Sequence, residues 1–187
     1  MEKVNAARKA EIRPRNYAFI DGQNLHMSVK NQGWVLDYRR FRRYLTDKYN
    51  VGKAFLFIGH IPTNADLYKS LQEYGYILIF KPILEVRGKV KGNVDAELVL
   101  QAMIEYPNYD KAVIISGDGD FHCLIKYLRS NGKLLKLMVP DDSRYSSLLR
   151  KFAPDIVGIN RLKDKLNCEK KRGGIAAGQN PLDSLPS

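Results

Sequence analysis

The chain has few of the residues that build disulfide frameworks or zinc sites. Its 187 residues include two cysteines and three histidines. Cys123 and Cys168 do not form a CxxC pair, and the histidines have no metal-ligand spacing. A disulfide-stapled secreted domain and a zinc site are therefore both disfavoured, and we expect a reduced, cytoplasmic protein.

Signature motifs of several enzyme classes are also missing. The sequence contains no GxGxxG, no GxxxxGK(S/T) and no GxSxG. Dinucleotide binding, P-loop chemistry and a serine nucleophile elbow therefore have no sequence support. No window approaches the roughly 18 apolar residues of a membrane span, and the charged N-terminus lacks the apolar core of a secretory signal. We expect no association with a membrane.

Positive charge, by contrast, is in excess. The formal net charge is +11. The first 15 and the last 27 residues each carry +3, which leaves +5 for the body of the chain. A basic surface of this kind favours a polyanionic partner such as nucleic acid, although basicity can also serve solubility alone.

Short apolar runs alternate with helix-like segments along the chain. Strands are expected at 17–20, 53–59, 76–80, 111–115 and 134–139, with one more edge strand near 155–159. Because helices separate these runs, the fold class is α/β, with a mostly parallel central sheet and helices on both faces.

The same pattern indicates one domain with two extensions. Residues 16–162 form the expected domain, and 44% hydrophobic content over the chain suits a globular core. Residues 1–15 are expected to be a basic N-terminal arm. Residues 163–187 become charged and then Gly-rich, so we expect a disordered tail.

Four aspartates stand at the ends of apolar runs or at the start of a helix. Asp21 follows the run YAFI, Asp118 and Asp120 follow AVII within SGDGD, and Asp95 begins a helical pattern after KGN. Parallel strands bring such positions together at one edge of a sheet. Because clustered carboxylates repel, a proton or a cation must neutralise them, and a magnesium-type cation fits this ligand set.

Each of these acids also has a structural interpretation. Asp21 is typical of a turn and helix cap, and Asp95 suits the positive end of a helix. Capping after the fourth strand would need one aspartate, whereas this turn has Asp118 and Asp120 separated by a glycine. An EF-hand is disfavoured because the other oxygen ligands of its loop are missing.

Three motifs in order resemble those of NYN domain proteins of the LabA-like branch, in the PIN-like nuclease superfamily. They are FIDGQNL (19–25), KGNVD (91–95) and ISGDGDF (115–121), and the resemblance covers about 17–160. It implies a PIN-like α/β/α sandwich and metal-dependent ribonuclease activity with Mg²⁺ or Mn²⁺. The implied catalytic and metal-binding residues are Asp21, Asp95, Asp118 and Asp120, with Asn24 and Ser116 as supporting residues.

The expected function is therefore a metal-dependent ribonuclease, more specifically an endoribonuclease, with RNA as its partner. Candidate phosphate contacts are Arg39, Arg40, Arg42, Arg43, Lys89 and Lys91. Trp34, Tyr38 and Tyr44 could stack on bases, although aromatic residues at helical spacing more often belong to the core.

Two alternatives stay open at this point. The domain could be a non-catalytic RNA-binding or regulatory module that retains the fold and a structural cation. The substrate could also be DNA or a small phosphoester. Self-association into a homo-oligomer is likewise undecided by the sequence.

Overall fold

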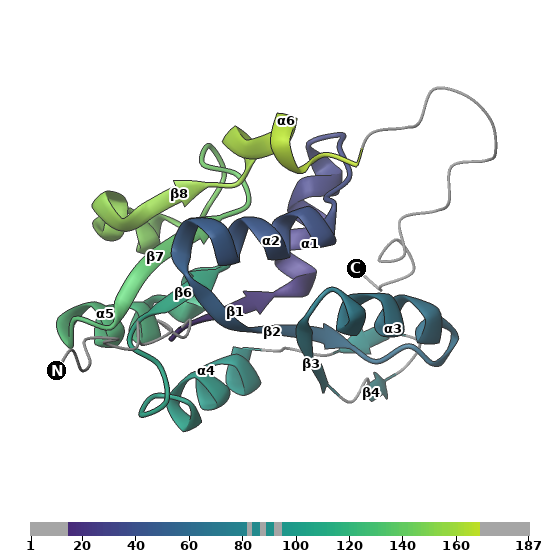
Figure 1. Cartoon of the computed structure of the whole chain (residues 1–187), viewed down its shortest axis with the longest axis horizontal. Helices are drawn as coiled ribbons and strands as arrows, with labels where there is room; N and C mark the ends of the chain where they lie inside the picture. Colours follow the sequence, from purple (N-terminus) through teal and green to yellow (C-terminus); the bar gives the residue numbers. More distant parts are fainter. Residues whose placement is uncertain (1–14, 82–83, 87–88, 92–94, 169–187) are drawn as a thin grey trace, which may run out of the picture.

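The chain folds around a central parallel sheet (Figure 1). The structure, a computed structural model, describes residues 15–81, 84–86, 89–91 and 95–168. Six strands pair in parallel in the order β3–β2–β1–β6–β7–β8. They are β1 (Asn16–Asp21), β2 (Val51–Gly59), β3 (Tyr76–Lys81), β6 (Ala112–Ile115), β7 (Leu134–Val139) and β8 (Ile156–Gly158).

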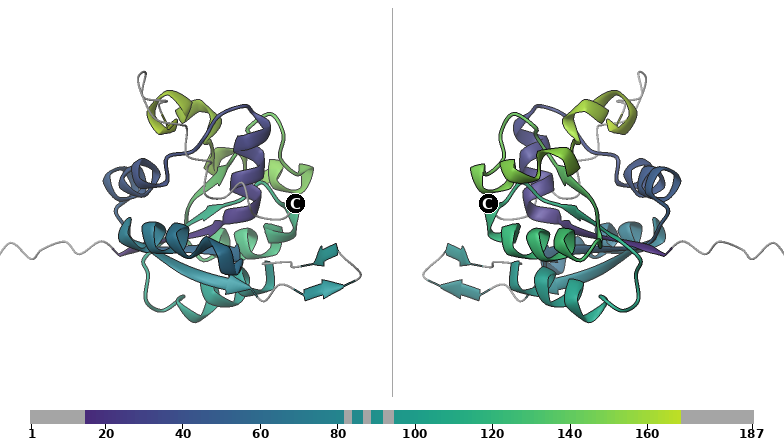
Figure 2. Two further views of the ribbon diagram at one scale, coloured as in Figure 1. Left: turned by 90° about the vertical axis from the view of Figure 1, so that its right-hand side faces the viewer. Right: turned by 90° about the vertical axis from the view of Figure 1, so that its left-hand side faces the viewer.

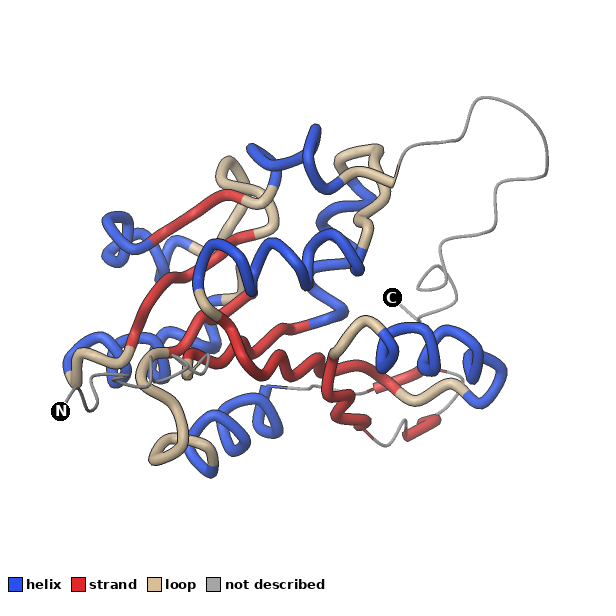
Figure 3. The backbone as a smooth tube through the Cα atoms, viewed as in Figure 1, coloured by secondary structure: helices blue, strands red, loops and turns tan. Residues whose placement is uncertain are grey.

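Helices cover both faces of this sheet (Figure 3). One face carries α1 (Gly22–Asn31), α2 (Tyr38–Tyr49), α3 (Ala65–Glu73) and α6 (Lys163–Leu166). The other carries α4 (Asp95–Ile104) and α5 (His122–Ser130). Short 3₁₀ turns complete the domain: η1 (Pro62–Asn64), η2 (Gly119–Phe121), η3 (Ser147–Asp155) and η4 (Asn160–Leu162). A hairpin of β4 (Leu84–Val86) and β5 (Lys89–Lys91) projects from the body (Figure 2).

The strands alternate their side chains between two apolar cores. In β1, Ala18 and Ile20 pack under α1 and α2, whereas Tyr17 and Phe19 face α4 and α5. Successive side chains of a strand point to opposite faces, so a strand buried on both faces reads as a continuous apolar run. The Phe19 and Phe55 rings stack with centroids 5.3 Å apart.

The expected fold class is confirmed. The chain forms a three-layer α/β/α sandwich whose six main strands are all parallel, and the edge strand expected near 155–159 is β8. Among the residues that the structure describes, every helix is too short or too polar to cross a membrane.

A short helix, α6, follows residue 162, the expected end of the domain. Leu162 ends η4 and Leu166 ends α6, within a charged stretch; Leu162 is partly buried and Leu166 is buried in the core under α2. The Leu166 carbonyl accepts a hydrogen bond of 2.8 Å from the Asp37 N–H. Two leucines in a charged run were too weak a signal to place this segment.

Candidate metal centre

The expected acids lie at the point where the order of the strands along the chain reverses, between β1 and β6. From β1 the chain proceeds to β2 and β3 on one side, and from β6 to β7 and β8 on the other. Asp21 is the last residue of β1, and Ser116 directly follows β6, its neighbour. Open parallel sheets bind ligands at this topological switch point, outside the carboxyl ends of the strands.

Three carboxylates meet at this point. Asp95, Asp118 and Asp120 each offer an oxygen, and these atoms all lie within 4.8 Å of one another. Asp95 comes from the start of α4, whereas Asp118 and Asp120 come from the turn after β6. We call Asp95, Asp118 and Asp120 the acidic group.

The size of the acidic group suits a small hard cation. Two oxygens on opposite sides of Mg²⁺ are separated by about 4.2 Å, given its ligand distances of 2.0–2.1 Å. Spacings of up to 4.8 Å therefore need only small side-chain rotations to meet around one ion. Asp95 and Asp118 are half-buried and Asp120 is exposed, so the group opens to solvent and to a substrate.

Asp21 lies beside the acidic group and is more deeply buried, with 4% of its surface exposed. Its carboxylate accepts hydrogen bonds from the Asn24 N–H (3.0 Å) and from the Ser116 hydroxyl (3.1 Å). Burial raises the pKa of Asp21 to about 6, and the negative charges of Asp95 and Asp118 add to the rise. A nearby cation would reverse that electrostatic effect.

Asn24 and Ser116 connect the turn after β1, which follows Asp21, with the turn after β6, which carries Asp118 and Asp120. The Asn24 side-chain oxygen accepts from the Gly117 N–H at 2.9 Å, and the Ser116 hydroxyl oxygen accepts from the Asp118 N–H at 3.1 Å. These hydrogen bonds fix the turn after β6 against the start of α1. The two residues therefore orient the Asp21 carboxylate and hold the backbone of Gly117 and Asp118 in place.

The capping interpretation also holds in part. Asp21 caps α1 through its bond from Asn24, and Asp118 caps η2 by accepting from the Asp120 N–H at 3.0 Å. The capping bond uses one oxygen of Asp118, which leaves its second oxygen for a cation, whereas both oxygens of Asp21 accept hydrogen bonds. The two interpretations therefore do not exclude each other.

Gly22 explains how α1 approaches the sheet so closely. A Cβ atom at this position would lie 2.5 Å from the Ile58 side chain and 2.8 Å from the Phe57 carbonyl oxygen. Both neighbours belong to β2, so a side chain here would push the helix start outward. Such a shift would move Asn24 and the Asp21 cap away from the acidic group.

The arginines of α2 lie at a different edge. The Arg42 guanidinium donates to the carbonyls of Gly52 (2.8 Å) and Gly75 (2.9 Å), at the amino ends of β2 and β3. Arg40 pairs with Asp37, and Arg43 with Asp47. Together with Arg39 these side chains line a hollow of about 530 Å³. Since the acids follow the carboxyl ends of β1 and β6, the two sets occupy opposite edges of the sheet.

The remaining expected contacts have mixed outcomes. Lys89 and Lys91 belong to β5, where the description is confined to the backbone. Trp34 and Tyr38 are core residues, with 5% and 7% exposure, so they offer no ring for stacking. Tyr44 packs against Tyr49 at 5.8 Å. Helical spacing predicted this core role better than the stacking role.

Comparison of the sequence with known protein families identifies the family of this chain. The profile described as NYN domain matches residues 16–158. The chain belongs to the NYN domain family. The resemblance expected from the three motifs is therefore confirmed.

Two relatives extend this comparison. Low amplitude and bright protein LabA of Synechococcus elongatus is 27% identical over 164 residues, which cover 81% of this chain and 88% of the relative. The crystal structure of a protein of unknown function from Vibrio parahaemolyticus has a TM-score of 0.67 at 23% identity. That match covers 84% of this NYN chain and 98% of the other, and it shows a shared fold.

Proposed function

We propose that this NYN protein is a metal-dependent ribonuclease that cuts RNA phosphodiester bonds at the carboxyl edge of its sheet. The observation that carries the proposal is the meeting of Asp95, Asp118 and Asp120 within 4.8 Å at the switch point. The chain's net charge of +11 adds support, because a basic protein around an acidic centre suits a phosphate substrate.

The acidic group would hold one Mg²⁺ or Mn²⁺. When bound, such a cation supplies positive charge that stabilises the attacking and leaving oxygens of a phosphodiester. Asp95, Asp118 and Asp120 contribute the oxygens, and Asp21 adds negative charge from behind them. Asn24 and Ser116 would keep the Asp21 carboxylate and the backbone of Asp118 in place through their hydrogen bonds. Arg39, Arg40 and Arg43 would contact phosphates farther along the strand.

A cleavage assay tests this proposal. We expect labelled single-stranded and hairpin RNAs to be cut with Mg²⁺ or Mn²⁺ and left intact with EDTA. Asp120→Asn should lower the rate at least 100-fold, the order expected when charge stabilisation in the transition state is lost. Asp164→Asn is the matched control, since it removes the same charge from an exposed position on α6. Undiminished cleavage by Asp120→Asn would remove this residue from the mechanism.

A second function has a specific observation in its favour. The capping bonds of Asp21 and Asp118 give these acids a structural task that needs no catalysis. A non-catalytic RNA-binding module with a structural cation would keep them for that reason. Such a protein would bind RNA and gain stability from Mg²⁺ but cut no substrate, including DNA, under any metal tested.

A further inference from the structure

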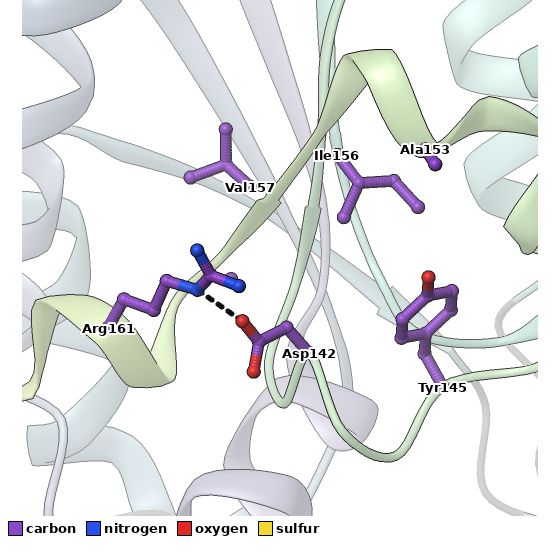
Figure 4. A pocket seen from close by; sticks show the side chains of 7 residues that line it. Asp142, Tyr145, Ala153, Ile156, Val157 and Arg161 are labelled. Carbon is purple, nitrogen blue, oxygen red and sulfur yellow. Dashed lines mark hydrogen bonds and ion pairs between the residues drawn. The ribbon is translucent and has the colours of Figure 1, made fainter.

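A second hollow lies beside the turn after β6, which carries Asp118 and Asp120. It has a volume of about 410 Å³, within the usual range of small-molecule sites. Figure 4 shows its walls, which come from the loop after β7, from η3 and from β8 with the turn that follows it. The lining residues used below are Asp142, Tyr145, Ala153, Ile156 and Arg161. We call this hollow the base pocket.

Tyr145 stands between the base pocket and the acidic group. A Cβ atom built on Gly117 would lie 3.5 Å from the Cβ of Tyr145, an ordinary contact distance. The Ser146 N–H also donates to the Gly117 carbonyl at 3.0 Å. Gly117 immediately precedes Asp118, so one residue separates the wall of the pocket from a carboxylate of the acidic group.

The base pocket has one polar wall and one apolar wall. Asp142 and Arg161 form an ion pair through the arginine Nε, and the Asn160 side-chain amide holds the second Asp142 oxygen at 2.8 Å. These bonds lower the pKa of Asp142, the Asn160 bond most of all, so the carboxylate stays charged. Across the hollow lie the Tyr145 ring and the Ile156 side chain (Figure 4).

This pattern matches a nucleobase. Bases of a single strand are recognised by stacking on an aromatic side chain and by hydrogen bonds to their edges. Tyr145 offers the ring and Ile156 an apolar surface. Arg161 has a side chain that is 77% exposed, and its terminal nitrogens have no partner among the described residues. It can therefore donate to a base edge while its Nε stays paired with Asp142.

We propose that the base pocket holds one nucleobase of the RNA strand, in the nucleotide next to the phosphate at the acidic group. This inference rests on the proposed function for the position of the phosphate. It adds a site that gives the enzyme a requirement for an unpaired base beside the cut. The substrate would then be single-stranded at that point, because a paired base cannot turn into the pocket.

Filling the pocket is the sharpest test. Ala153 lines it and is otherwise exposed, so Ala153→Phe should occupy the space without disturbing the core. Ala65→Phe makes the same change at an exposed position of α3 and serves as the control. Both changes are introduced into the Asp120→Asn variant, which prevents cleavage. Affinity is then measured for an RNA octamer and for eight versions with one base removed in turn.

With the pocket open, removal of one particular base should weaken binding by about 5- to 150-fold, the range that corresponds to one stacked base. Ala153→Phe should bind the intact octamer that much more weakly and lose the dependence on that base. Arg161→Gln should weaken the same position, and Ala65→Phe should leave the pattern intact. Thermal melts verify that each variant is folded.

Two results would overturn the base pocket: equal affinity for all nine oligonucleotides, or a sensitive base that persists in Ala153→Phe. Absence of RNA binding would overturn it too. Its failure is separable from that of the nuclease proposal. If protein with Asp120 intact cuts RNA while the scan is flat, only the pocket falls. If it never cuts, yet one base matters and Ala153→Phe removes that dependence, the nuclease proposal falls and a base-binding site remains.

Discussion

At the scale of single residues, Asp118 combines a structural bond with a charge. Its carboxylate caps η2 through the Asp120 N–H and also belongs to the acidic group. Asparagine is as good a cap as aspartate, so Asp118→Asn removes the charge and retains the capping bond. Alanine removes both. The two variants therefore separate the functions of one side chain.

We expect Asp118→Asn to be as stable as the original protein, or more stable, without metal, because repulsion within the acidic group is relieved. If the acidic group binds Mg²⁺, the original protein should gain about 2.7 kcal/mol at 100 times the dissociation constant, and Asp118→Asn should lose this stabilisation. Asp118→Ala should lose about 0.5–2 kcal/mol more than Asp118→Asn for the missing cap. Thermal melts with Mg²⁺ and with EDTA measure all three. A large loss in metal-free Asp118→Asn would contradict the repulsion argument.

Asp21 predicts a pH dependence with a definite sign. Its pKa rises from 3.8 to about 6 in the folded protein, chiefly through burial. Between these values the unfolded chain loses the proton while the folded chain keeps it. The free energy of unfolding therefore falls mainly between about pH 4 and pH 6, by about 3 kcal/mol over the full titration, and the loss persists above pH 6.

Asp21→Asn cannot ionise, so it should lack this contribution. In EDTA, its stability relative to the original protein should improve by about 2.4 kcal/mol between pH 4 and pH 7.5. Urea unfolding at the two pH values measures the difference, in which titration of the other groups cancels. A difference that does not change with pH would mean that Asp21 ionises as easily in the folded protein as in the unfolded chain.

Sequence patterns singled out four acids as candidates, but they did not predict the environment of each acid. Asp21, Asp95, Asp118 and Asp120 could be chosen because each ends a strand or begins a helix, and parallel strands bring such ends together. The deep burial of Asp21 could not be foreseen, since it depends on how closely α1 packs against β2. Tyr145 was missed altogether. It lies in a polar loop, and the hydrogen bond next to it, from the Ser146 N–H to the Gly117 carbonyl, joins segments 29 residues apart.

At the scale of elements, the strands and most helices followed from local patterns. The apolar runs of β1, β2 and β6 are buried on both faces and therefore have little ambiguity. The segment after β7 was harder to predict. After β7 the chain forms η3, a 3₁₀ turn over Ser147–Asp155 with Pro154 inside. Proline lacks the N–H that an α-helix needs, so tertiary packing decides the local form.

Arg42 was a candidate phosphate contact, and its position on α2 gives it a structural role instead. Its guanidinium donates to the Gly52 and Gly75 carbonyls, so this side chain joins α2 to the starts of two strands. We expect Arg42→Ala to cost on the order of 1.5–3 kcal/mol, as for hydrogen bonds to a charged group. Arg39→Ala, at an exposed position of the same helix, should stay within about 0.5 kcal/mol. Urea unfolding compares them, and equal effects would refute a structural role for Arg42.

At the scale of the whole molecule, charge is divided between two edges of the sheet. The acidic group lies at the carboxyl ends of the strands, and the arginine hollow on α2 lies near the amino ends. The nine residues of β2 set the distance between the edges, about 30 Å at 3.3 Å per residue. An RNA that contacts both must therefore be long enough to cross the molecule.

This separation makes the effect of the arginines depend on RNA length. Replacing Arg39, Arg40 and Arg43 by Gln keeps the structural Arg42 and removes three positive charges. For a long single strand, affinity should fall and the slope of log affinity against log salt should flatten by up to about 2, since each lost contact changes it by about 0.7. A tetranucleotide that reaches only the acidic group should be bound and cut as before.

Binding titrations at several salt concentrations, with a tetranucleotide and a 20-nucleotide RNA, measure this difference. Lys163→Gln with Lys165→Gln, at two exposed positions of α6, controls for a general loss of positive charge. Equal weakening of both RNAs would mean that the arginines act through the overall electrostatic field of the protein, which a short strand also experiences. A contact at the arginine hollow could not weaken the binding of a tetranucleotide that does not reach it. An unchanged slope for the long RNA would remove the α2 arginines from the binding surface and leave the positive charge of the remaining surface to hold the strand.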